Sequence, residues 1–228
     1  MALCAAAWTG CQESGFDEAK ETARPLKVQH LFGESKVPGQ AEAPATLSVE
    51  ALDDTLALDV DPAAARVPGA KLPWYLRSEA GGVRLLEQGE SPPADADLII
   101  ASAPQSRGQF AALSRLAPTV VIDEGGAQWK LNLRLVGEAL GRTNGAEALL
   151  TSYDRQLARV RNALPDDARV AGRFAADSFA AAVLADAGVE LVSRGGEGAT
   201  LTASAWSAPG GALAARAALA DLQRVLTK

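Results

Sequence analysis

The chain has 228 residues, which suits one large domain or two small lobes, and only 5% of them are aromatic, so the core must be built from Leu, Val and Ala. The net charge of −6 and the pI of about 4.9 argue against DNA or RNA binding, because phosphate backbones are bound by a concentrated basic face. No apolar run is long enough to span a membrane.

The chain opens with MALCAAAWTGCQESG, which is apolar and uncharged up to Cys11 and then becomes polar. This stretch resembles the end of a bacterial lipoprotein signal, in which the cysteine after the cleavage site receives lipid. Gly10 and Thr9 suit the positions before the cut, whereas Trp8 stands where Leu, Val or Ile is usual. The pattern predicts lipidation at Cys11. The alternative is the frayed, apolar terminus of a cytosolic protein.

Both cysteines, Cys4 and Cys11, lie in this leader, so nothing after them can form a disulfide or a thiolate metal site. His30 is the single histidine, so a histidine zinc site, a Ser-His-Asp triad or a Cys-His dyad would each depend on that residue. We therefore expect that the protein has no metal site and is not an enzyme. A hydrolase that uses His30 as its base is kept as an alternative.

Short elements follow a charged tether that ends near residue 24. The expected strands are residues 28–32, 46–49, 83–86, 97–101, 119–122 and 169–174. The apolar residues whose spacing predicts the first two helices are Leu52, Leu56 and Val60, and then Phe110, Leu113 and Leu116. Prolines and glycines predict loops at residues 34–44 and 62–73.

A polar, glycine-rich elbow, DEGGAQW, follows the strand at residues 119–122. Apolar side chains from Trp129 to Leu140 then fall on one face of a helix. A second amphipathic helix is expected at residues 146–164. At 1.5 Å per residue it is roughly 30 Å long, which is enough to cross from one lobe to another.

The last part of the chain predicts two more helices. Asp177 is placed to cap a helix that ends at Gly188, and the chain closes with a helix at residues 212–226. Because buried strands alternate with helices, we expect an α/β fold with a parallel sheet built from βαβ units.

Six segments occur in a set order along the chain. They are HLFGESKVP at 30–38, DLII at 97–100, LSRLAPTV at 113–120, the run from Trp129 to Leu164, DSFAAAVL at 177–184, and Trp206 followed by GGALAA at 210–215. Their order and spacing resemble the ferric-siderophore substrate-binding lipoproteins of bacterial ABC importers. The resemblance implies two Rossmann-like α/β lobes joined by a long inter-lobe helix. It also implies a ligand held in the cleft between the lobes and only a small closing motion.

The resemblance divides the chain into four parts. These are a signal remnant and tether at 1–24, an N-terminal α/β lobe at 25–142, the inter-lobe helix at 143–164, and a shortened C-terminal α/β lobe at 165–228. The segment before DLII is cut to GESPPADADL, and the stretch between Gly188 and Trp206 is shorter than in the family. In the family those two regions carry the surface glutamates that dock the permease, and neither glutamate can be placed here.

In parallel α/β sheets, ligands lie beyond the carboxyl ends of the strands, so the loop at residues 102–108 is a candidate wall of the cleft. The guanidinium of Arg107 suits the negative oxygens of a ferric siderophore, with a plain surface arginine as the alternative. Trp129 either offers a ring to the ligand or begins the buried face of its helix. Trp74 and Tyr75 are adjacent, so one of them should point toward solvent or ligand.

Arg173 and Phe174 close the first strand of the second lobe, where a plain strand end is the alternative. Trp206 lies in a loop, where rings are more often functional than in helices. The predicted ligand-binding residues are therefore Trp74, Tyr75, Gln105, Arg107, Trp129, Arg173, Phe174 and Trp206. We expect His30 to be structural and the pair Asp53-Asp54 to cap a helix end.

These observations predict a monomeric, lipid-anchored binding protein outside the cytoplasmic membrane. It would deliver an Fe(III)-siderophore, of hydroxamate or mixed type, to an ABC permease. No cofactor is needed, because the chelator itself fills the coordination sphere of the iron. The alternatives are a corrin- or haem-binding relative and a degenerate, non-transporting paralogue.

Overall fold

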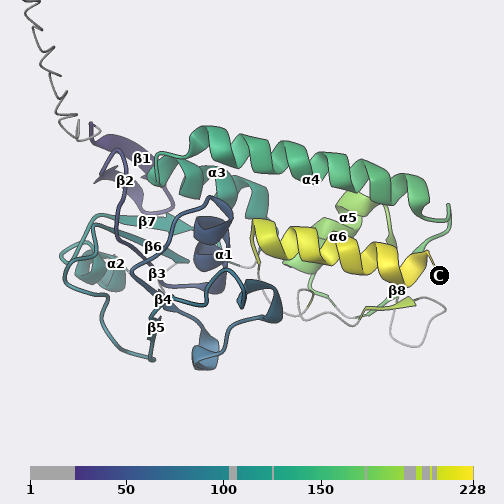
Figure 1. The fold of residues 1–228 in the computed structure, drawn as a ribbon, viewed down its shortest axis with the longest axis horizontal. Coiled ribbons are helices and arrows are strands. Elements are labelled where there is room, and N and C mark those ends of the chain that lie inside the picture. Colours follow the sequence, from purple (N-terminus) through teal and green to yellow (C-terminus); the bar gives the residue numbers. More distant parts are fainter. Residues whose placement is uncertain are drawn as a thin grey trace, which may run out of the picture.

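The computed structural model describes residues 24–102, 107–124, 126–172, 174–192, 199–201, 206 and 210–227. It shows two groups of strands at opposite ends of the molecule, with helices between and above them (Figure 1). The leader with its predicted lipidation site, Cys11, lies outside the described residues.

The first lobe is built on a five-stranded parallel sheet in the order β5-β4-β3-β6-β7. Its strands are β3 (Pro44–Thr46), β4 (Ala64–Arg66), β5 (Leu85–Leu86), β6 (Leu98–Ser102) and β7 (Thr119–Ile122). The apolar runs of β6 and β7 pair over four residues and are almost fully buried. The parallel sheet expected from those runs is therefore confirmed.

Helices cover the two faces of this sheet. α1 (Val49–Ala57) and α3 (Trp129–Ala139) pack on one face, where Leu98, Ile100 and Ile122 join the main core. α2 (Arg107–Leu113) lies over the opposite face. The short 3-10 helices η1 (Pro68–Ala70) and η2 (Trp74–Leu76) lie in the loop between β4 and β5.

An antiparallel hairpin, β1 (Leu26–His30) and β2 (Gly33–Val37), precedes the sheet, where the sequence predicted a strand followed by a loop. The Ser35 hydroxyl donates to the Thr119 carbonyl, 2.7 Å away, and so ties the hairpin to β7. The backbone N–H of Phe32 donates to His30 Nδ1, so neutral His30 carries its proton on Nε2, 2.9 Å from Ser35 Oγ. Partial burial lowers the pKa of His30. These hydrogen bonds fit the structural role predicted for His30, although its side chain also lines a cavity of about 400 Å³ beside α3.

The second lobe has a smaller sheet. Its described strands are β8 (Arg169–Ala171), β9 (Glu190–Val192) and β10 (Ala199–Thr200), which are parallel in the order β10-β8-β9. α5 (Phe179–Ala187) ends at Gly188 in the left-handed conformation, as predicted. Its cap is Ser178, one residue after the predicted Asp177.

Two helices, rather than the single predicted one, run between the lobes. α4 (Thr143–Ala163) has 21 residues and crosses the top of the molecule in Figure 1. α6 (Ala212–Leu226) lies alongside it, and its first turn rests on α1 of the first lobe. The inter-lobe connection is therefore two helices wide.

The elbow after β7 provides a third contact between the lobes. Gly126 forms an isolated antiparallel bridge with Ser178 at the start of α5. Gly126 has a φ of 80°, and a Cβ placed there would lie 2.6 Å from the Cβ of Phe179. A side chain is thus excluded here both by backbone conformation and by space.

Replacing Gly126 with alanine should lower the free energy of unfolding by about 2 to 3 kcal/mol, because a methyl group would push the elbow away from α5. Urea denaturation measures this change. Gly188→Ala is the matched control, since Gly188 has a similar φ of 71° but open space around its Cα. Equal losses in the two variants would show that the contact between the elbow and α5 contributes nothing.

Candidate functional site

The loop that leaves the carboxyl end of β4 places two predicted residues, Trp74 and Tyr75, in η2. Trp74 is 49% exposed, whereas Tyr75 is 9% exposed and its ring packs edge-on against Trp74 at 6.0 Å. One ring is thus buried and the other is accessible, as expected for adjacent aromatic residues.

Trp74 and Tyr75 form one wall of a cavity of about 540 Å³ between the first lobe and the two inter-lobe helices, which we call the junction groove. The opposite wall comes from the exposed face of α6, with Leu213 and Arg216, and from Gln156 of α4. Gln156 Nε2 donates to the Arg216 carbonyl and holds the two helices together at this point. The groove therefore combines an exposed indole ring, one guanidinium, the carboxylate of Glu79 and an apolar helix face.

A buried acidic cluster lies beneath the groove. Asp53 accepts from the backbone N–H groups of Gly211, Leu213 and Ala214, and Asp54 accepts from that of Ala212. The four distances are 2.7–3.1 Å, so the N–H groups that α6 cannot satisfy internally are all satisfied. The pair does cap a helix, but the prediction that it lies at a helix or turn end is wrong: both residues lie inside α1, and the helix that they cap, α6, is at the far end of the chain.

Burial controls the protonation of this cluster. It raises the pKa of Asp53 to about 7 against the opposing effect of its three backbone donors. Burial and the neighbouring charge of Asp53 raise the pKa of Asp54 well above its usual value, and burial also raises that of Glu50. Burial, reinforced by the Asp53 charge, raises the pKa of Tyr75, which stays a neutral phenol.

Trp129 lies in the core, which corrects its prediction as a ligand contact. Its side chain is 2% exposed and packs against Tyr153 at 4.8 Å and Phe179 at 6.3 Å. It therefore joins α3 to α4 and α5, which explains why a large ring stands at the end of the elbow. The helical spacing of the apolar residues that follow it had indicated this alternative.

Trp206 is also buried, at 4% exposed, and its Nε1 donates to Asp221 Oδ2 at 2.8 Å. Phe174 is half-buried beside it, with the ring centroids 6.5 Å apart. Trp206 thus contacts α6 through Asp221, and neither residue lines the junction groove. A ligand contact by Trp206 would need its indole to leave the Asp221 carboxylate.

Arg107 is exposed at the start of α2, with its guanidinium carbon 5.9 Å from the centroid of the Phe32 ring. It lies apart from Trp74 and does not line the junction groove. Gln105 and Arg173 fall outside the described residues. Arg216 and Gln156 were missed, because each reads as one polar residue on an ordinary helix face and only the packing of α6 brings them opposite Trp74.

No protein-family model matches this chain. The probable siderophore-binding lipoprotein YfiY of Bacillus subtilis (strain 168) is 25% identical over 175 residues, which are 73% of this chain and 54% of YfiY. The petrobactin-binding protein YclQ of Bacillus subtilis has a similar structure, with a TM-score of 0.69 at 17% identity over 90% of this chain and 99% of YclQ.

A TroA-like periplasmic binding protein from Xylanimonas cellulosilytica also has a similar structure, with a TM-score of 0.63 at 18% identity over 86% of this chain and 92% of that one. The fold is that of a periplasmic binding protein. The resemblance to siderophore-binding lipoproteins predicted from the sequence is confirmed as a similarity. The chain spans about half the length of the curated relatives that it matches, 54% and 56%.

Proposed function

We propose that this chain is the substrate-binding component of an ABC importer, which captures an Fe(III)-siderophore between its lobes and delivers it to a membrane permease. The observation that carries the proposal is the junction groove, where an accessible indole of the first lobe and a guanidinium on α6 line one cavity in a chain of periplasmic-binding-protein fold. The name of the relative YfiY supports the choice of ligand.

Binding by this groove would need no chemical step. The chelator fills the coordination sphere of the iron, and the groove contacts the outer surface of the complex. Trp74 offers its ring to apolar parts of the chelate, and Arg216 offers a charged fork of donors to its anionic oxygens. A cavity of about 540 Å³ lies within the usual size range of ligand pockets, roughly 300 to 1,000 Å³.

We also propose that lipid at Cys11 anchors the protein outside the cytoplasmic membrane and that it acts as a monomer on its permease. None of the helices within the described ranges is long and apolar enough to cross a membrane. Labelling of Cys11 by a lipid probe, lost in Cys11→Ser, tests the anchor directly. Labelling that persists in the variant would contradict it.

Replacing Trp74 with alanine should weaken binding of the preferred ferric siderophore by roughly tenfold or more, because truncating an exposed aromatic anchor removes its contact area. Isothermal titration calorimetry with ferrioxamine, a ferric catecholate, haem and a corrin gives the affinities. Leu131→Ala is the control, since Leu131 is 58% exposed and lies on α3, away from the junction groove.

Each result of these titrations has a defined meaning. Tight binding of a ferric siderophore that is weakened only by Trp74→Ala supports the proposal. If only haem or a corrin binds, the proposed ligand is that compound and not a ferric siderophore. If no ligand binds, the chain is a degenerate, non-transporting paralogue.

A further inference from the structure

The two faces of the first-lobe sheet are covered unequally. α1 and α3 bury one face completely, whereas the other carries Ala45 and Ile99 and is covered mainly by α2. All seven residues of α2 are described, and none of them is buried. Residues 87–97, between β5 and β6, are also described and contain turns but no helix. The strand residues are still buried, but this thin cover leaves a hollow between α2 and the loop at residues 87–97.

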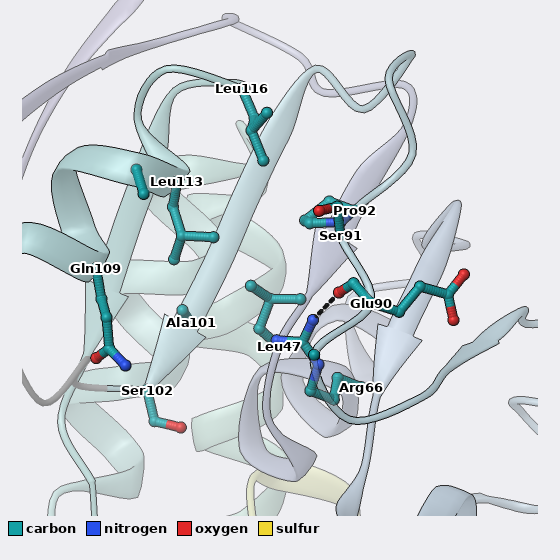
Figure 2. A pocket seen from close by; sticks show the side chains of 12 residues that line it. Leu47, Arg66, Glu90, Ser91, Pro92, Ala101, Ser102, Gln109, Leu113 and Leu116 are labelled. Carbon is teal, nitrogen blue, oxygen red and sulfur yellow. Dashed lines mark hydrogen bonds between the residues drawn. The ribbon is translucent and has the colours of Figure 1, made fainter.

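A cavity of about 380 Å³ fills this gap, and we call it the sheet-face pocket. Figure 2 shows its floor on β6, with Leu113 and Leu116 on one side and Leu47 and Pro92 on the other. Its lining comes entirely from the first lobe, so it is separate from the junction groove.

Arg66, at the carboxyl end of β4, brings a positive charge to this apolar pocket. Its Nη2 donates to the Glu90 carbonyl, while its buried Nε has no acceptor among the described residues. A buried N–H without an acceptor costs free energy, and the oxygen of a water or of a ligand would relieve that cost. Ser102 and Gln109 add polar atoms near the same end of the pocket (Figure 2).

The balance of charge around Arg66 favours a ligand with one negative charge. The Glu90 carboxylate is paired with Arg84 and accepts from the Glu87 N–H, and the pKa of Glu90 is lowered chiefly by that backbone bond and also by both arginines. Two guanidinium groups therefore share one carboxylate. Figure 2 shows that this carboxylate points away from the pocket.

We propose that the sheet-face pocket binds a small monocarboxylate with an apolar body, such as a medium-chain fatty acid. The carboxylate accepts from the Arg66 guanidinium, which matches its planar geometry, and the apolar body lies against the leucines that line the pocket. This site is independent of siderophore binding in the junction groove.

Isothermal titration calorimetry with decanoate, below its critical micelle concentration, tests the proposal. Arg66→Met keeps the length of the side chain but removes the donors, and should weaken decanoate binding roughly tenfold or more, as expected for a hydrogen bond between charged groups. Arg84→Met is the matched control. It removes the same charge beside Glu90, but Arg84 does not line the pocket, so it should change the affinity by no more than about twofold.

Two further measurements separate this site from a general apolar surface. Decanol should bind far more weakly than decanoate, and Ala112→Trp should abolish decanoate binding by filling the pocket. The proposal is overturned if decanoate does not bind, if decanol binds equally well, or if Arg84→Met loses as much affinity as Arg66→Met. Ferric-siderophore affinity should be the same in Arg66→Met and the unmodified protein, which keeps this test apart from the proposed function.

Discussion

Replacing Asp53 with alanine should lower the free energy of unfolding by about 2 to 4 kcal/mol. The change leaves the backbone N–H groups of Gly211, Leu213 and Ala214 without their acceptor in a buried place. Because these donors begin α6, the loss should loosen the attachment of the C-terminal helix to the first lobe. Urea denaturation measures the stability, and hydrogen exchange at residues 213 and 214 measures the loosening.

Asp166→Ala is the control for this prediction, since Asp166 is an exposed aspartate in the turn after α4. Its removal should change the stability by less than about 0.5 kcal/mol. If Asp53→Ala unfolds at the same urea concentration as this control, α6 does not depend on the carboxylate.

The protein should be more stable in mild acid than in mild base. Burial raises the pKa of Asp53 to about 7 in the folded protein, well above the ordinary value for an aspartate, so the folded state binds the proton more tightly than the unfolded chain does. The resulting stabilisation is complete below about pH 4 and is lost as the pH rises through about 7. Between pH 5 and pH 8 we expect Asp53 to lower the free energy of unfolding by roughly 2 to 4 kcal/mol, and the lowered pKa of His30 to oppose part of this fall.

The variant Asp54→Asn tests the origin of this pH dependence. Its amide oxygen can still accept from the Ala212 N–H, and its NH₂ group replaces Oδ2, which has no partner among the described residues. Removing the second buried carboxyl should make the variant at least as stable as the unmodified protein at pH 8 and should flatten the dependence. If the free energy of unfolding of the variant depends on pH as steeply as that of the unmodified protein, the pH dependence comes from groups outside the acidic cluster.

Several elements could be predicted from the sequence because local patterns determined them. The continuous apolar run at Thr119–Ile122 and the final helix at Ala212–Leu226 have the predicted bounds, and Gly188 ends α5 as expected. β4, by contrast, was predicted as a loop. It is three residues between prolines with no strand-forming side chain, and it is a strand because β3 and β5 pair on either side of it.

The candidate site was less predictable than the fold. Sequence reasoning correctly expected that one ring of Trp74 and Tyr75 would be accessible, because that conclusion needs only two adjacent residues. It could not place Trp129, since a ring at the start of a helix suits both a core and a cleft until the packing of α4 and α5 is known. It also missed Arg216, which lies far along the chain from Trp74.

The sequence alone determined the α/β class, the long α4 and the resemblance to siderophore-binding lipoproteins, because those follow from periodicity and from the order of motifs. Only the tertiary structure decided that α6 is capped by Asp53 and Asp54, some 158 to 161 residues away, and that the junction is two helices wide. The physical reason is that an N–H donor at the start of a helix can be satisfied by any carboxylate that packing brings near. No local pattern specifies which carboxylate that will be.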